Sequence, residues 1–188
     1  MNKNISVKNI ALLGLGIAIN VVGSFIALAL KLPIYLDSIG TILVAGILGP
    51  KYAIISGFLG SIVSGMTFDI YSLYFAPVQI STGLLAGIMF KKGMLKGRKT
   101  PLGTFIFVLP TSIISAMIAA VVFGGVTSSG SAYIVQALEV LSIGNLLSNV
   151  FFTQIITDYA DKFLGVVLVN LAINSMPKSL KSSFMLSK

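Results

Sequence analysis

Seven side chains in this sequence have types suited to holding a small ligand, since pockets combine aromatic or apolar walls with a few fixed polar groups. They are Asp37, Thr41, Tyr74, Gln79, Asn145, Asn149 and Asp158. Asn145 and Asn149 are four residues apart, so a helix would present both on one face. Nothing in their types or spacing resembles a reaction centre. The set therefore predicts a site that binds a small molecule.

The residue types in the chain exclude most catalysis. There is no cysteine and no histidine, which removes thiol chemistry, the commonest general base and the commonest metal ligand. Gly14-Leu15-Gly16 lacks the third glycine of a nucleotide-binding fingerprint. Asp158 and Asp161 could form a carboxylate pair, but the adjacent Lys162 indicates an ion pair or a capped helix start. We therefore expect no catalytic residue, no metal ligand, no cofactor and no ATPase activity.

The composition predicts that these residues are positioned by helices in a membrane. Of the 188 residues, 56% are hydrophobic and only 10% are charged, against about 25% charged in ordinary soluble domains. The mean hydropathy is +1.01. A net charge of +8 is compatible with nucleic-acid binding, but in a membrane chain it more often reports basic cytoplasmic loops. We expect a single all-α membrane domain over residues 1–188, with the lipid bilayer and no nucleic acid as a partner.

Apolar runs divided by charged residues, glycine and proline predict six transmembrane helices. Their approximate ranges are 10–30, 34–49, 52–68, 73–90, 102–126 and 159–176. A signal peptide is the alternative for the first run, but an apolar stretch of about 20 residues is long for one.

The region 133–176 allows two interpretations, one long broken helix or two elements. A continuous span would hold Asp158, Asp161 and Lys162 near the bilayer centre, at about 2.5–3.5 kcal/mol each. We therefore expect a polar-faced helix near the outer surface, followed by a last span that begins near Asp158.

The basic residues predict the orientation. With six spans and the N-terminus inside, eleven of the 13 basic residues lie on the inner side, among them Lys3, Lys51, Lys178, Lys181 and Lys188. Such a bias favours cytoplasmic termini. The seven candidate ligand residues then gather toward the outer side, where Tyr74 could alternatively belong to the aromatic belt of the membrane surface.

Small residues four apart allow close helix packing in lipid. Most such stripes are expected to serve packing within the chain. The first span differs because it carries two sets, Gly14 with Ala18, and Gly16 with Asn20 and Ser24. One face could pack inside while Gly14 and Ala18 meet a partner protein.

The stretch LPIYLDSIGT at 32–41, followed by GILGPKYA at 46–53 and by Gly57, resembles the substrate-binding S components of energy-coupling factor (ECF) transporters. Asp161-Lys162, which opens the predicted last helix, and Pro177, which closes it, are similar too. The resemblance implies high-affinity binding of a vitamin or related micronutrient at the outer side of a prokaryotic plasma membrane. It also implies a transmembrane coupling protein and two ATPase subunits as partners. Gly14-xxx-Ala18 is the nearest match to the small-residue motif that meets the coupling protein, with glycine replacing the first alanine.

The ligand stays open at this point. There is no tryptophan to stack on a flavin or thiamine ring, and the amides and carboxylates favour a hydrogen-bonding heterocycle, such as a purine-like base, a deazapurine or another heterocyclic vitamin. A stand-alone secondary transporter or channel is one alternative function, although no inverted repeat supports it. A ligand-sensing membrane module is another. An integral-membrane enzyme is the least supported, because the catalytic residue types are missing.

Overall fold

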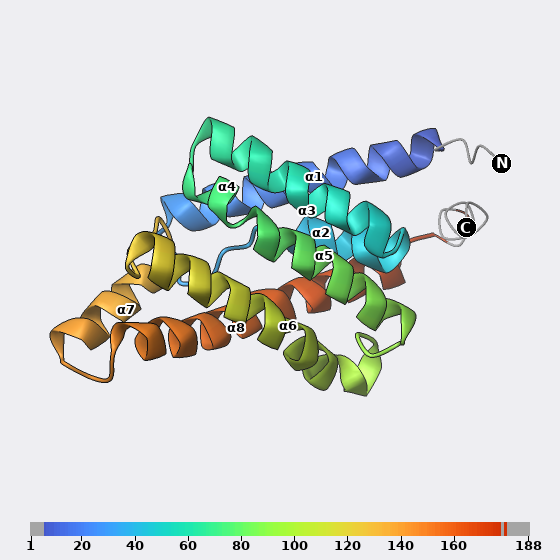
Figure 1. The fold of residues 1–188 in the computed structure, drawn as a ribbon. Helices are drawn as coiled ribbons and strands as arrows, with labels where there is room; N and C mark the ends of the chain where they lie inside the picture. Colours follow the sequence, from blue (N-terminus) through green and yellow to red (C-terminus); the bar gives the residue numbers. More distant parts are fainter. Residues whose placement is uncertain (1–5, 178, 180–188) are drawn as a thin grey trace.

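The computed structural model describes residues 6–177 and Ser179, and its described part is a bundle of α-helices (Figure 1). Lys3, Lys178, Lys181 and Lys188, on which the predicted orientation partly rests, lie outside the described residues. The helices in chain order are α1 (Val7–Ala29), α2 (Ile39–Ile47), α3 (Pro50–Thr67), α4 (Tyr71–Tyr74), α5 (Ala76–Lys91), α6 (Thr100–Met117), α7 (Ser131–Val140) and α8 (Leu146–Ser175). A 3₁₀ turn, Gly97–Lys99, precedes α6, and a π-helical turn, Ile118–Val122, follows it.

Two predicted spans are shorter or more divided than expected. The run 34–49 forms only the nine residues of α2, because residues 30–38 are an irregular connection. Leu36 has a φ of 52°, and this left-handed backbone cannot belong to a helix. The run 73–90 is also divided, since α4 ends at Tyr74 and α5 begins at Ala76, with Pro77 in its first turn, where proline is tolerated.

The expected division of the last region at Asp158 is wrong. One helix, α8, runs over 30 residues from Leu146 to Ser175, and Asp158, Asp161 and Lys162 are buried in its middle. The separate helix before it is the short α7, which ends at Val140. The insertion cost assumed isolated charges, whereas Asp158 and Lys162 are one turn apart and pair with each other.

Glycine lets the helices at the centre of the bundle approach closely. A Cβ atom added at Gly40 of α2 would lie 1.8 Å from the carbonyl oxygen of Gly16 on α1. A Cβ added at Gly83 of α5 would lie 2.6 Å from the carbonyl carbon of Ala53 on α3. At both crossings only glycine leaves room for the facing backbone. The α1–α2 contact is also tied by Asn20, whose Oδ1 accepts from the backbone N–H of Gly40 at 2.7 Å.

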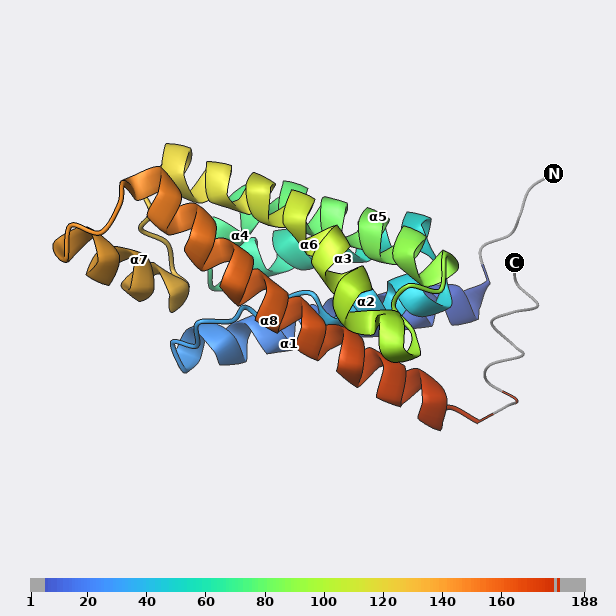
Figure 2. The same ribbon diagram turned by 90° about the horizontal axis from the view of Figure 1, so that it is seen from below.

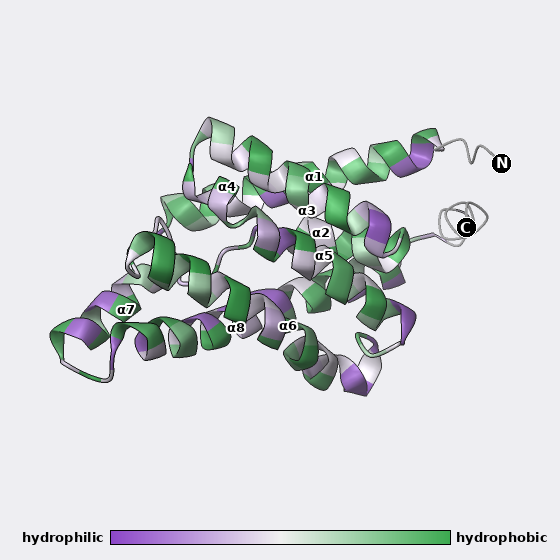
Figure 3. Cartoon of the chain, viewed as in Figure 1, coloured by the Kyte–Doolittle hydropathy of each residue, from purple (hydrophilic) through white to green (hydrophobic). Residues whose placement is uncertain are grey.

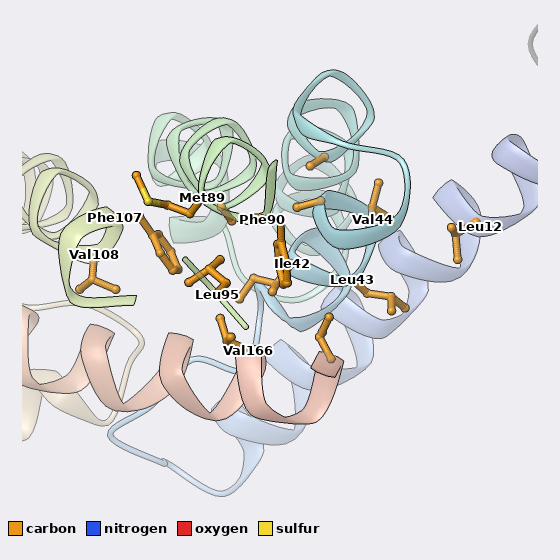
Figure 4. Close-up of a cluster of buried hydrophobic side chains, with 14 residues drawn as sticks. Leu12, Ile42, Leu43, Val44, Met89, Phe90, Leu95, Phe107, Val108 and Val166 are labelled. Atoms are coloured by element: carbon orange, nitrogen blue, oxygen red, sulfur yellow. The ribbon is translucent and has the colours of Figure 1, made fainter. Parts of the chain in front are cut away.

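An apolar core fills one half of the bundle. Figure 4 shows side chains from α1, α2, α5, α6 and α8 converging there. Ile42, Phe107 and Val166 are fully buried in this cluster. The core fixes the crossings of the same helices that continue to the other half of the bundle.

The start of α1 and the end of α8 lie at one end of the molecule, and α7 lies at the other (Figures 1 and 2). Figure 3 shows hydrophobic residues along most of the helices, and hydrophilic residues at several helix ends and along the middle of α8. Within the described residues, two helices are long and apolar enough to cross a membrane by length and composition, Val7–Ala29 and the combined helix Gly97–Val122.

Candidate ligand-binding cleft

A cleft opens in the half of the bundle where α1 ends, away from the apolar core. Its walls come from α1, the 30–38 connection, α3, α4, α5, α6, residues 127–129 and α8. It contains about 820 Å³ of empty space, which includes space open to solvent.

Asp158 and Lys162 of α8 form a charged part of the cleft wall. The Lys162 Nζ lies 3.2 Å from Oδ1 of Asp158 and 3.8 Å from Oδ2 of Asp161. The hydroxyl of Ser112 on α6 donates to the second oxygen of Asp158 at 2.8 Å. The three charged side chains are at most 2% exposed. Buried charges are tolerable in this form because each has a partner of opposite charge.

The 30–38 connection is held against α8 by Asp161. The backbone N–H of Leu36 donates to Oδ1 of Asp161 at 2.7 Å, and the hydroxyl of Ser38 donates to Oδ2 at 3.3 Å. Because Leu36 has a positive φ, its conformation needs support from its surroundings. Asp161 therefore links the ion pair of α8 to the backbone next to the cleft.

Tyr35 is a second attachment of the same connection. Its hydroxyl donates to Oε1 of Gln154 on α8 at 2.9 Å and lies 2.9 Å from the hydroxyl of Ser131 at the start of α7. Burial raises the pKa of Tyr35 to about 12, with the charge of Asp158 acting in the same direction. Tyr35 thus stays a neutral hydrogen-bond donor at every physiological pH.

Asp37 belongs to the same 30–38 connection, and it also lines the cleft. Burial raises the pKa of Asp37 to about 7, and the charge of Asp161 acts in the same direction. The charge of Lys162 and a hydrogen bond from the side chain of Gln79 act in the opposite direction. Asp37 therefore titrates near neutral pH, so its charge can respond to a ligand.

Aromatic and hydroxyl groups complete the cleft. Tyr71 and Phe75 line it, and Phe123 packs behind them, with ring centroids 4.8 Å and 6.2 Å away respectively. On the facing wall the hydroxyls of Ser24 and Ser64 are 3.2 Å apart. The cleft therefore joins an apolar, partly aromatic wall to a wall rich in hydrogen-bonding groups.

Three of the seven predicted ligand residues, Asp37, Gln79 and Asp158, come together in this cleft. Thr41 is fully buried, and its hydroxyl accepts from the Asn20 amide at 2.8 Å, so it joins α1 to α2. Tyr74 is 52% exposed and packs edge-on against Phe123. Neither Thr41 nor Tyr74 lines the cleft.

The two predicted asparagines lie near the turn between α7 and α8. Asn145 caps α8, where its Oδ1 accepts from the Ser148 backbone at 2.9 Å, and this role is typical of asparagine. Asn149 is buried and donates to the carboxylate of Glu139 on α7. The structure thus gives both amides partners within the chain and leaves them outside the cleft lining.

Sequence reasoning missed several cleft residues as ligand candidates. Lys162 and Ser61 line the cleft, whereas the sequence indicates only an ion pair for Lys162 and places Ser61 only among small residues spaced four apart. Ser24 and Asn20 also line the cleft, whereas the sequence places them only in a small-residue set of the first span. For Asn20 a signal was available, because an amide in the middle of an apolar helix usually faces another polar group or a cavity.

The predicted partner residues Gly14 and Ala18 lie on the exposed side of α1. A Cβ atom added at Gly14 would have no neighbour within 4 Å, whereas one added at Gly16 would lie 2.6 Å from Cγ2 of Val44. The two small-residue sets of α1 thus face opposite ways. Among the described residues there is also no group of three or more acidic side chains placed to hold a metal ion.

A helical bundle with an apolar exterior and a polar cleft closed by paired charges is the architecture of a membrane protein that binds a small molecule. The family model described as "ECF-type riboflavin transporter, S component" matches residues 4–178. The chain therefore belongs to this family of S components, which are membrane-embedded parts of transporters that bind a small-molecule substrate and work with an ECF module. No curated protein and no solved structure matches the chain.

Proposed function

We propose that this chain binds riboflavin, or a closely related heterocyclic vitamin, with high affinity in the cleft and presents it for uptake. The observation that supports this most is the buried and acceptor-rich lining, where Asp37, Gln79 and Asp158 face one cleft with Tyr71 and Phe75. Riboflavin has a planar ring for the aromatic wall and a polyhydroxyl chain whose donors suit carboxylates and hydroxyls. The family description points to the same vitamin.

The proposed arrangement in the membrane has six spans formed by α1, α2, α3, α5, α6 and α8, with both termini in the cytoplasm. It is supported by the common end at which α1 begins and α8 ends (Figures 1 and 2). The basic stretch 91–99 joins α5 to α6, as the positive-inside rule requires of a cytoplasmic loop. The cleft then opens to the outside of a prokaryotic plasma membrane.

The proposed partners are a transmembrane coupling protein and two ATPase subunits, which would supply the energy for uptake. The exposed Gly14 and Ala18 offer the coupling protein a shallow face on α1, because small residues allow helices to approach closely. The large apolar side chains Leu15 and Val22 beside them are also exposed, which suits lipid or a partner helix.

Thermal unfolding of the purified chain in detergent, with riboflavin and a panel of other vitamins, nucleobases and deazapurines, tests the binding proposal. A ligand at roughly 1,000 times its dissociation constant stabilises the folded state by about 4 kcal/mol. Riboflavin should give such a shift, and its fluorescence on titration should give the affinity. A purine or deazapurine as the sole hit would contradict riboflavin as cargo. No hit in the whole panel would contradict the proposed function.

Two leucine substitutions on one helix provide the control for this binding measurement. Ser61 lines the cleft from α3, and Val63, two residues later, is 39% exposed. Ser61→Leu should fill the cleft and remove the ligand-induced shift, whereas Val63→Leu should keep it. Equal shifts in both variants would move the site elsewhere.

The partner face is tested by co-purification and uptake. Gly14→Leu combined with Ala18→Leu should keep ligand binding but lose both the coupling protein and transport, since bulk is added only to an exposed face. Transport by the double variant at the wild-type rate would remove this assignment. Val121→Leu adds bulk at an exposed position in the turn after α6, away from α1, and serves as the control that keeps transport.

A further inference from the structure

Four buried side-chain oxygens have no hydrogen-bond partner within the described part of the chain. They are Ser56 Oγ, Gln79 Oε1, Thr82 Oγ1 and Thr104 Oγ1. Three of them are hydroxyls that do not belong to the cleft lining. Gln79 alone of the four lines the cleft, although its side chain is so enclosed that the residue is only 5% exposed. A buried acceptor without a partner is unfavourable, so this one points to a group that arrives with the ligand.

The position of Gln79 is fixed by its surroundings. The carbonyl oxygen of its backbone would lie 2.7 Å from a Cβ added at Gly57, so α5 and α3 are in close contact at this residue. The Gln79 side chain also hydrogen bonds to the carboxylate of Asp37. An amide can only donate to a carboxylate, which means that its NH₂ group faces Asp37. The remaining atom, Oε1, is then held in place as an acceptor.

The neighbours of Gln79 on α5 indicate which part of a ligand reaches this oxygen. Phe75 and Val78 also line the cleft, and Phe75, four residues before Gln79, lies on the same helix face as the amide. A planar ring packed on Phe75 and Val78 would direct its edge, not its face, toward the amide. The hydrogen-bond donors on the edge of a heterocycle are ring N–H and exocyclic amino groups, and an acceptor such as Oε1 selects a donor. The flavin ring has no amino group, so its edge donor is a ring N–H.

We propose that Gln79 is a specificity-determining residue whose Oε1 accepts a hydrogen bond from a ring N–H of the bound vitamin. This inference rests on the proposed function. In riboflavin the isoalloxazine ring has a single N–H, at N3 between two carbonyls. The chemical class selected is therefore a planar heterocycle with an unsubstituted imide or lactam N–H, and alkylation of that nitrogen removes the interaction.

The test compares riboflavin with 3-methylriboflavin on the full chain in detergent, by fluorescence titration. The wild-type chain should bind the methylated flavin roughly 10- to 100-fold more weakly, because Oε1 loses its donor and is buried without a partner. Gln79→Met keeps the size of the side chain and removes the acceptor. This variant should bind the two flavins with equal affinity, near that of the weaker wild-type complex.

Thr82→Val is the matched control, because Thr82 is fully buried on the same helix and its hydroxyl also lacks a partner. It lies outside the cleft lining, so this variant should discriminate between the flavins as the wild type does.

Riboflavin binding without discrimination by the wild type would overturn the role of Gln79 and leave the proposed function intact. The same conclusion follows if the methylation penalty persists in Gln79→Met. Absence of binding to both flavins by the wild type would contradict the proposed function, and this inference with it. If Gln79→Met does not fold, the comparison of the two flavins on the wild type still decides.

Discussion

The two halves of the bundle use the same helices for different purposes. In one half α8 contributes Val166 and Val169 to an apolar core, and in the other it contributes Asp158, Asp161 and Lys162 to the neighbourhood of the cleft. The apolar half is held by the packing of buried side chains such as Ile42 and Phe107. The polar half is held by ion pairing, in which Lys162 pairs with both Asp158 and Asp161. The cleft wall can therefore be buried and charged while the apolar half keeps the helices packed.

Loss of Lys162 should produce the largest effect on stability. Lys162→Met leaves Asp158 and Asp161 buried without their cation, and breaking such a pair costs about 3–5 kcal/mol. Val166→Ala, one turn later in the apolar half, removes only two methyl groups and should cost about 1–2 kcal/mol. Thermal unfolding of both variants in detergent measures the difference.

If the unpaired acids cause the loss of stability in Lys162→Met, removing their charges should restore it. Neutralising both acids together with the lysine, as Asp158→Asn, Asp161→Asn and Lys162→Met, leaves no uncompensated charge and should recover much of the lost stability. A Lys162→Met variant as stable as the wild type would show that the polar half does not depend on pairing.

Removal of the Asp161 acceptor should be the next largest effect, and it should act on ligand binding. Asp161→Ala leaves the N–H of Leu36 without its partner, so the 30–38 connection loses an attachment that is worth about 1–3 kcal/mol. We expect ligand affinity to fall roughly 5- to 100-fold, mostly through faster dissociation. Asp161→Asn keeps an acceptor oxygen and should lose less. Equal affinities of the alanine variant and the wild type would separate this connection from binding.

Ligand affinity should change about tenfold between pH 6 and pH 8. Because the pKa of Asp37 is raised to about 7 in the free protein, its carboxylate is mostly protonated at pH 6 and mostly ionised at pH 8. A ligand that donates to the ionised form lowers this pKa on binding, so affinity should rise about tenfold between these pH values. Asp37→Asn should bind more weakly and with no such slope. Affinity that falls as the pH rises would mean that the protonated carboxyl binds the ligand as a donor.

The sequence predicted the helical class and the family better than it predicted the lining of the cleft. The helical class, the membrane family and the inward and outward faces of α1 followed from local patterns, since Gly14 and Gly16 must face opposite sides of a helix. The continuity of α8 did not follow, because a per-residue insertion cost treats Asp158 and Lys162 as separate charges. Their spacing of four residues was visible in the sequence and is the signal that favours a single helix.

The candidate site residues show the same contrast between local patterns and contacts made only in the folded chain. Asp37 and Gln79 meet through the crossing of the 30–38 connection with α5, a contact between distant segments that no local pattern encodes. Conversely, Thr41 and Asn149 had the right residue types, but each has its hydrogen-bond partner within the chain, Asn20 and Glu139 respectively. Residue type indicates that a polar group needs a partner, and only the fold decides whether that partner is a ligand.

Asn149→Ala should therefore give the smallest effect on binding. Asn149 lies outside the cleft lining and donates to Glu139, so its removal unties α7 from α8 without touching the ligand. We expect ligand affinity within about twofold of the wild type and a loss of roughly 1 kcal/mol in stability, the usual value of one hydrogen bond. Glu139→Gln, which keeps an oxygen for the Asn149 amide, should be close to the wild type in both measurements. A large loss of affinity in Asn149→Ala alone would extend the ligand site from the cleft to the α7–α8 turn. The cleft in the polar half of the bundle would then no longer account for all of the binding.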